Sequence, residues 1–385
     1  MANDFGALVT SLPAMLDTVL REQIGFIPAV NIDAQASSAA FGQTIQYPLV
    51  PDMTIVDANA DCCDVPCGAE IDWEVGSMVI NNDKAVRFCW TGEEDLAINN
   101  SYNQSGQRMR NMEVDEAIRL LVNSIEQSIA AVAGNAAHVY TPINGGVLFN
   151  QQSDNIKDLA NIRKILHRSA TPDNDRHLVM GFDASANLVN TYNLTRANEN
   201  ASDATLRRGE MLNLLNFGMH ESFAADEGTT GSGATGAGFL VNGAAAAGSL
   251  TVTVDTGTGT IPAGTRVTFA GNADSYIVAS YAANVITLRT ALSGAVADNA
   301  AVTVDGAGYG AQLAFHRRAI VLAARTPRIL GGQDRARNRA YVTDPYSGLT
   351  FMVSEYDGYR ATNFELSIVW GVKMVKPEMA VLIPQ

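Results

Sequence analysis

Residues 363–383 read NFELSIVWGVKMVKPEMAVLI, and this stretch decides the class of fold. Apolar side chains occupy alternate positions of its first half, at Phe364, Leu366, Ile368, Trp370 and Val372. Alternation with a period of two predicts a strand with one buried face. Pro377 interrupts the pattern, and the residues MAVLI then predict a last strand. The C-terminal part of the chain is therefore expected to be β.

Helical periodicity marks two other segments. Residues 101–140 carry a one-sided apolar stripe, which predicts a long helix lying across a sheet. The stripe consists of Ile118, Leu121, Val122, Ile125, Ile129, Val132 and Ala136. Residues 312–325, QLAFHRRAIVLAAR, predict a further helix that ends before Pro327.

The segment between these two regions alternates helix and strand. Residues 156–167, 185–192 and 206–215 predict helices, and residues 177–182, HLVMGF, predict a strand. Together with the C-terminal strands, this alternation indicates an α+β fold.

The N-terminal part lacks a core of its own. Residues 5–23 predict an amphipathic helix with Leu8, Leu12, Leu16 and Leu20 on one face, followed by an extended arm to Ser37. Residues 43–50 predict a strand and residues 51–70 a loop. Residues 71–80 and 84–90 predict a hairpin around the turn Asn81-Asn82-Asp83. An isolated helix and a lone hairpin are marginal in water, so we expect them to pack on another domain or on a neighbouring subunit.

Residues 228–310 differ in composition from the rest of the chain. Glycine, alanine and threonine dominate, and charged residues are few. Short β runs recur at residues 249–254, 266–270, 275–280, 285–288 and 301–304. Such spacing, with glycine-rich borders on both sides, predicts a small inserted all-β domain of barrel type.

Composition and motifs exclude several functions. The net charge of −14 in 385 residues argues against general binding to nucleic acid. No P-loop, HExxH or GxSxG motif is present, and Gly231-x-Gly233-x-x-Gly236 precedes a strand rather than a helix, so it reads as a linker. The histidines and the cysteines form no recognisable constellation, so no cofactor, metal or catalytic residue is expected. They are His138, His167, His177, His220, His316, Cys62, Cys63, Cys67 and Cys89.

Arginines gather late in the chain, at positions 317, 318, 325, 328, 335, 337 and 339. They fit contact with DNA or with an acidic surface of a neighbour. Aromatic residues that could stack on bases do not alternate with them, so we favour ion pairs between subunits.

Three stretches resemble the coat proteins of the Salmonella P22-like podophages. In residues 368–383 an aromatic-Gly-Val strand leads to a basic residue, Pro-Glu and a final apolar strand. Residues 313–325 contain the core Ala-Phe-His-Arg, and residues 261–278 read IPAGTRVTFAGNADSYIV. The order of elements is similar to the Hong Kong 97 (HK97-like) fold of tailed-phage and herpesvirus capsid proteins. The insertion is shorter than this resemblance leads us to expect.

The resemblance implies an α+β capsid fold with an inserted all-β, barrel-like domain, and it divides the chain into seven parts. They are an N-terminal arm (1–38), an E-loop hairpin region (39–98), a P-domain spine helix (99–140), the first part of the A-domain (141–228), the β insertion (229–310), an A-domain helix and connector (311–340) and a C-terminal β part of the P-domain and A-domain (341–385).

The function implied is that of a major capsid protein, not an enzyme, that self-assembles into the icosahedral head around tailed-phage double-stranded DNA. Implied partners are further copies in hexamers and pentamers (T=7 is one arrangement), a separate scaffolding protein, a portal protein, a decoration or cement protein, and DNA through non-specific contacts. No membrane is involved, and the protein belongs in the virion after assembly in the host bacterial cytoplasm. An encapsulin-like nanocompartment shell is the alternative, and a hydrolase or metal enzyme is a weaker one.

Contacts between subunits are expected from the arm, the hairpin and the arginines. The residues are Leu8, Leu12, Leu16, Asp72, Trp73, Lys84, Arg87, Arg328, Arg335, Arg337 and Arg339. Lys84 is the one lysine placed to suit the crosslink that some relatives form, and no accompanying signal supports it.

Overall fold

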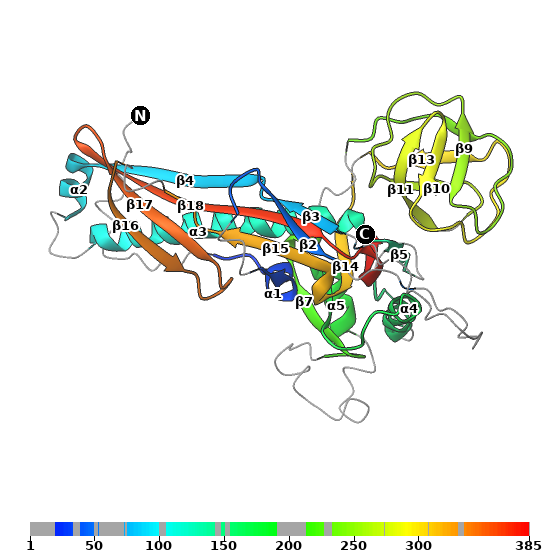
Figure 1. Cartoon of the computed structure of the whole chain (residues 1–385), viewed down its shortest axis with the longest axis horizontal. Helices are drawn as coiled ribbons and strands as arrows, with labels where there is room; N and C mark the ends of the chain where they lie inside the picture. Colours follow the sequence, from blue (N-terminus) through cyan, green and yellow to red (C-terminus); the bar gives the residue numbers. More distant parts are fainter. Residues whose placement is uncertain are drawn as a thin grey trace, which may run out of the picture.

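The computed structural model describes residues 20–33, 39–49, 53, 73, 75–99, 105–142, 148–150, 155–190, 213–226, 233–272, 274–306, 308–329 and 335–384. They form an elongated body of one long sheet with a helix along it, a second sheet at one end, and a separate barrel (Figure 1).

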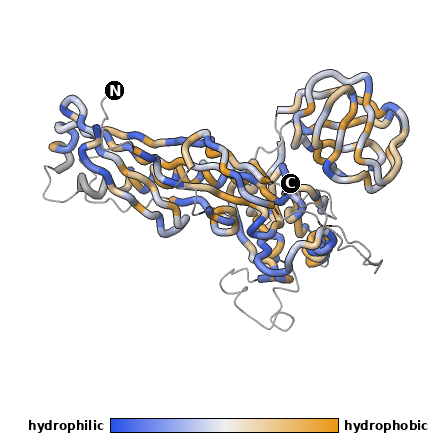
Figure 2. Tube along the Cα trace, viewed as in Figure 1, coloured by the Kyte–Doolittle hydropathy of each residue, from blue (hydrophilic) through white to orange (hydrophobic). Residues whose placement is uncertain are grey.

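The long sheet is built around β18 (Ala361–Met374), which contains the alternating stretch. The other strands are β1 (Asn31–Ile32), β4 (Asn82–Thr91), β15 (Ile320–Arg325), β16 (Ala336–Thr343) and β17 (Thr350–Asp357). β4 pairs with one edge of β18, and β17 and then β15 pair in turn with the other edge. Figure 2 shows apolar residues along these strands and more hydrophilic ones at the end of the body near α2 (Gly92–Asn99).

The predicted long helix is confirmed as α3 (Ser105–Val132), which is shorter than expected and is followed by a 3-10 turn, η3 (Ala133–Asn135). Its 28 residues span about 42 Å. The apolar stripe lies against the long sheet, where Ile125 and Ile129 share a core with Trp370. The Trp370 indole also donates a hydrogen bond to Ser128 Oγ at 3.3 Å.

The prediction of a single buried face on β18 is wrong for its central residues. Leu366, Ile368 and Trp370 face the spine helix, but Val369 is buried as well. Val369 packs with Met78 and Ile80, because the base of a hairpin covers the second face of the sheet there.

The second sheet lies near the C-terminal end of α3 (Figure 1). Its strands are β5 (His138–Val139), β6 (Arg176–Met180), β7 (Phe217–Glu221), β14 (Ala311–His316) and β19 (Ala380–Pro384), in the order β5-β19-β14-β6-β7. Its helices are α4 (Asn155–Arg168), α5 (Phe182–Val189) and α9 (Phe223–Asp226). Helices α4 and α5 cover one face, and the other face joins the core of the spine helix. The predicted helix at residues 156–167, the strand at 177–182 and the closing strand are confirmed.

The helix predicted over residues 312–325 is wrong. These residues form β14 and β15, separated by a 3-10 turn, η4 (Arg317–Ala319). All six residues of β14 are buried in the middle of the second sheet. A strand buried on both faces reads as a continuous apolar run, and periodicity cannot distinguish it from a buried helix.

The hairpin predicted from residues 71–80 and 84–90 is also wrong in its pairing. β3 (Val75–Val79) pairs with β2 (Thr44–Pro48), and β4 leaves to pair with β18. The apolar residues of β4, Val86, Phe88 and Trp90, face the spine helix, so pairing with β18 buries them in the main core. The short β3 has no comparable core to offer.

The inserted barrel is confirmed. Its six strands are β8 (Phe239–Val241), β9 (Thr251–Asp255), β10 (Arg266–Phe269), β11 (Ser275–Ala282), β12 (Val285–Leu288) and β13 (Ala301–Val304). They close in the order β10-β11-β12-β9-β8-β13 around a core of their own. Residues 233–236 form coil ahead of β8, as a linker would.

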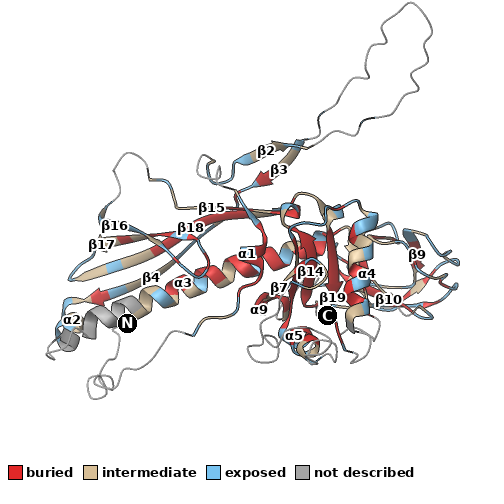
Figure 3. Cartoon of the chain, turned by 90° about the horizontal axis from the view of Figure 1, so that it is seen from below, coloured by how far each residue is buried: buried red, intermediate tan, exposed pale blue. Residues whose placement is uncertain are grey.

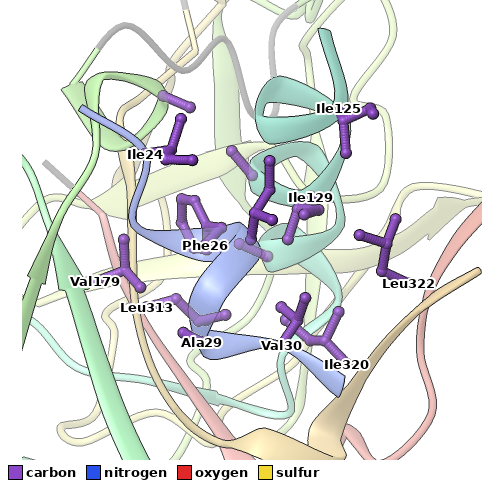
Figure 4. Packing of buried hydrophobic residues seen from close by; sticks show 14 of the residues in the cluster. Ile24, Phe26, Ala29, Val30, Ile125, Ile129, Val179, Leu313, Ile320 and Leu322 are labelled. Atoms are coloured by element: carbon purple, nitrogen blue, oxygen red, sulfur yellow. The ribbon is translucent and has the colours of Figure 1, made fainter. Parts of the chain in front are cut away.

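Two N-terminal predictions are only partly within the described residues. Leu8, Leu12 and Leu16 lie outside them, and residues 20–23 are not helical. The extended arm is interrupted by one helical turn, α1 (Phe26–Ala29), whose Phe26 packs against α3 and the second sheet (Figure 4). The helix predicted at residues 206–215 falls mostly outside the described residues, and residues 213–215 are not helical.

Candidate assembly surfaces

The hairpin of β2 and β3 projects from the body (Figure 3). Its base is buried, where Met78 and Ile80 pack on the long sheet. Val75 is 55% exposed, and Trp73, just before β3, is 59% exposed. A two-stranded hairpin is marginal by itself, and apolar side chains exposed together mark contact surfaces. The hairpin is therefore a candidate contact surface.

One glycine sets the geometry of this hairpin. Gly76 lies opposite Tyr47, and a Cβ on Gly76 would clash with the Tyr47 ring. The ring therefore lies across the glycine and links the two strands. Partial burial of the ring raises the pKa of the Tyr47 hydroxyl.

A buried carboxylate fixes the N-terminal arm to the body. Glu126 of α3 accepts hydrogen bonds from the backbone N–H groups of Gly25, Phe26 and Ile27 at 2.6, 2.7 and 3.0 Å, and from Ser222 Oγ at 2.7 Å. Burial raises the pKa of Glu126, although each of these bonds acts to lower it. Glu126 thus joins the arm, the spine helix and the segment after β7.

Helical periodicity alone does not single out Glu126, but its position on the helix indicates a role. It is an acidic residue on the buried face of the helix, between Ile125 and Ile129 of the apolar stripe. A fully buried carboxylate needs hydrogen-bond donors, so its position indicates a structural anchor.

A second contact of the arm is made by Arg21, in the non-helical residues ahead of α1. Arg21 pairs with the buried Asp344 at 2.6 Å. Burial alone would raise the pKa of Asp344, but the hydrogen bonds from Arg21 and Ser347 outweigh burial and hold it below its usual value. The Tyr346 hydroxyl donates to Gln23 Oε1 at 2.9 Å, so the described part of the arm packs on its own chain.

The late arginines do not form one cluster. Arg317 donates to the Pro28 carbonyl at 2.7 Å, and Arg337 lies 3.7 Å from Asp357. Arg325, Arg328 and Arg339 line one cavity, whereas Arg335 is exposed just ahead of β16.

The remaining predicted contact residues have different surroundings. Lys84 donates to Ser124 Oγ at 2.7 Å and lies 5.5 Å from the centre of the Trp370 ring, so it faces the spine helix. Arg87 pairs with Glu365 at 2.5 Å on the opposite face of the sheet. Asp72 lies outside the described residues.

Two histidines meet in the second sheet. His177 Nδ1 lies 3.0 Å from His220 Nε2 on adjacent parallel strands, whereas His167 contacts Asp173 at 3.2 Å. Burial, then the neighbouring His220 and Arg317, lowers the pKa of His177 to about 4. The pairing of β6 with β7 brings the two rings together across a long separation in sequence, which the sequence pattern could not reveal.

The described part of the chain contains no group of three or more His, Cys, Asp or Glu side chains placed to hold a metal ion. Cys89 is exposed, and the other cysteines lie outside the described residues. Among the described helices, none is both long and apolar enough to span a bilayer.

Comparisons with known proteins give structural matches only. No family model and no curated sequence matches the chain. The structure is similar to a chain of Mycobacterium phage Che8, with a TM-score of 0.52 and 15% identity, covering 96% of this chain and 93% of that one. It is also similar to a chain in the capsid structure of the cyanophage P-SCSP1u, with a TM-score of 0.55 and 12% identity, covering 96% and 90%. The α+β phage capsid fold expected from the sequence is confirmed.

Proposed function

We propose that this chain, which has the fold of a phage capsid chain, is a major capsid protein that self-assembles into an icosahedral head. The observation that carries the proposal is the projecting hairpin on that fold. Its exposed apolar residues Trp73 and Val75 have no core to enter among the described residues of their own chain. A neighbouring copy would bury them, as interfaces between permanently associated subunits do.

The parts of the fold take roles by analogy with this architecture. The hairpin would be the E-loop, α3 the spine of the P-domain, and the second sheet the A-domain. Hexamers and pentamers would form through the hairpin and the exposed arginines of the long sheet. The inserted barrel adds a surface beside the body, which a decoration protein could use.

The further partners follow from the proposed role. They are a separate scaffolding protein, a portal protein and packaged double-stranded DNA, with assembly in the bacterial cytoplasm and a final location in the virion. The net charge of −14 supports a container that does not grip its DNA generally. The role proposed for the chain is structural, not catalytic.

Electron microscopy of the full-length chain expressed in bacteria tests the proposal. We expect closed shells of uniform size built from hexamers and pentamers. A chain that stays monomeric at every concentration and salt condition would contradict it. Small, DNA-free shells filled with an enzyme would instead identify a nanocompartment.

A further inference from the structure

Three arginines converge on one cavity at the edge of the long sheet. Arg325 ends β15, Arg328 follows it, and Arg339 lies on β16 next to Tyr341. The cavity has a volume of about 440 Å³, and none of its described lining residues is acidic. Thr326, Pro327 and Ile329 complete the lining.

This arrangement favours an anion. Like charges that face one cavity repel each other, and a negatively charged group between them removes that repulsion. Arg325 Nε is buried without a hydrogen-bond partner in the described residues, while its Nη1 donates to the Thr326 carbonyl at 3.0 Å. A buried donor left unpaired is costly, and a guanidinium pairs best with a carboxylate or a phosphate.

The charge pattern of the chain indicates which anion. Residues 22–83 contain no lysine or arginine. Residues 49–74, which connect β2 to β3, contain seven acidic residues: Asp52, Asp57, Asp61, Asp64, Glu70, Asp72 and Glu74. In the sequence this segment joins Pro48 to Val75, and these two paired residues lie at the end of the hairpin that points away from the body (Figure 3). Its charge is complementary to that of the arginine cavity.

We propose that the arginine cavity of one copy receives carboxylates of the acidic segment, residues 49–74, of a second copy. This inference rests on the proposed capsid function and names the contact through which the hairpin acts. A carboxylate partner is favoured over DNA because a concave site lined by Tyr341 and Ile329 accepts side chains. A backbone-tracking nucleic-acid site would instead be an extended basic groove.

Charge reversal on both sides tests the contact. The cavity variant carries Arg328→Glu and Arg339→Glu, and the segment variant carries Asp61→Lys and Asp64→Lys. We expect each variant alone to lose shell formation at least tenfold, measured by sedimentation and electron microscopy. A mixture of the two variants restores association if the contact joins two copies. Lys164→Glu with Arg168→Glu, which makes the same change in net charge at two exposed positions of α4, should assemble normally.

Other results would overturn the proposal. Rescue by combining all four substitutions in one chain, without rescue by mixing, would show a contact within the chain. Normal shells with reduced DNA content in the cavity variant would identify a phosphate site. If the cavity variant fails to fold, as judged by circular dichroism, Arg328→Gln at the exposed Arg328 replaces it, and normal assembly of that variant in low and high salt would count against the contact. Assembly of the unsubstituted chain reports separately on the proposed function.

Discussion

The barrel and the hairpin differ in how the free edges of their strands are covered. Both are built from short antiparallel strands, but the barrel closes on itself and encloses Val252, Val267 and Phe269. The described hairpin has two strands and buries its base on another sheet. Closure removes free edges, whereas an open hairpin presents them to a partner. One region is thus stable within a single chain, and the other becomes fully buried only on assembly.

The largest effect is expected from a substitution in the core of the barrel. Phe269 is buried in its core and contacts the Tyr276 ring at a centroid distance of 5.7 Å. Phe269→Ala should destabilise the barrel by about 3–5 kcal/mol, because it leaves a cavity. Hydrogen exchange in residues 251–255 should accelerate, while exchange in β18 stays unchanged. Equal acceleration in both would show that the barrel and the body unfold as one unit.

Acid should destabilise the body more than the barrel. The pKa of His177 is lowered in the folded chain, so its contribution to stability is complete above the unfolded value near 6.5 and is lost as the pH falls through about 4. The loss is about 3 kcal/mol at most. All five histidines lie outside the barrel strands. Tryptophan fluorescence follows unfolding outside the barrel, because Trp73, Trp90 and Trp370 all lie there. The free energy of unfolding measured in this way should fall over this pH window.

The matched variant for this test is His177→Gln. It removes the titrating ring and should flatten the pH dependence of body stability between pH 6.5 and 4. An unchanged pH profile in this variant would assign the acid sensitivity to other groups.

A smaller effect concerns the joint between barrel and body. Arg289 of the barrel domain donates to the Ala136 carbonyl and to Asn135 Oδ1, both at 3.3 Å, beyond the C-terminal end of the spine helix. A cation is favourable at that end of a helix. Arg289→Ala should weaken the attachment of the barrel to the body by about 1–2 kcal/mol and leave the barrel folded. Limited proteolysis at residues 306–310 should speed up, and Arg266→Lys, which keeps the charge opposite Asp305, serves as a control.

The same contrast explains what the sequence could predict. The barrel strands were predictable because their alternation and turn residues are local, as in Thr251 to Asp255. The pairing of β3 with β2 was not predictable from the sequence. β18, with which β4 pairs in place of β3, lies far along the chain. The sequence predicts a helix over β14 and β15 because burial on both faces removes the alternation of these strands. Among the contact residues, Arg328 and Arg339 share a cavity that the sequence could not separate from Arg337, which pairs with Asp357.

The smallest effect on the stability of the single chain is expected for a substitution in the hairpin. This substitution tests whether the hairpin or the barrel is the assembly surface. Val75 in the hairpin is 55% exposed, and Leu250 in the barrel domain is 50% exposed. Val75→Ser and Leu250→Ser should each change the stability of the unassembled chain by no more than about 0.5 kcal/mol, because both sites are open to solvent. Only Val75→Ser should reduce shell formation, measured by sedimentation, because a neighbouring copy buries that side chain. If both variants assembled equally well, the exposed hairpin residues would not be an interface; if Leu250→Ser alone failed, the barrel would be the assembly surface instead.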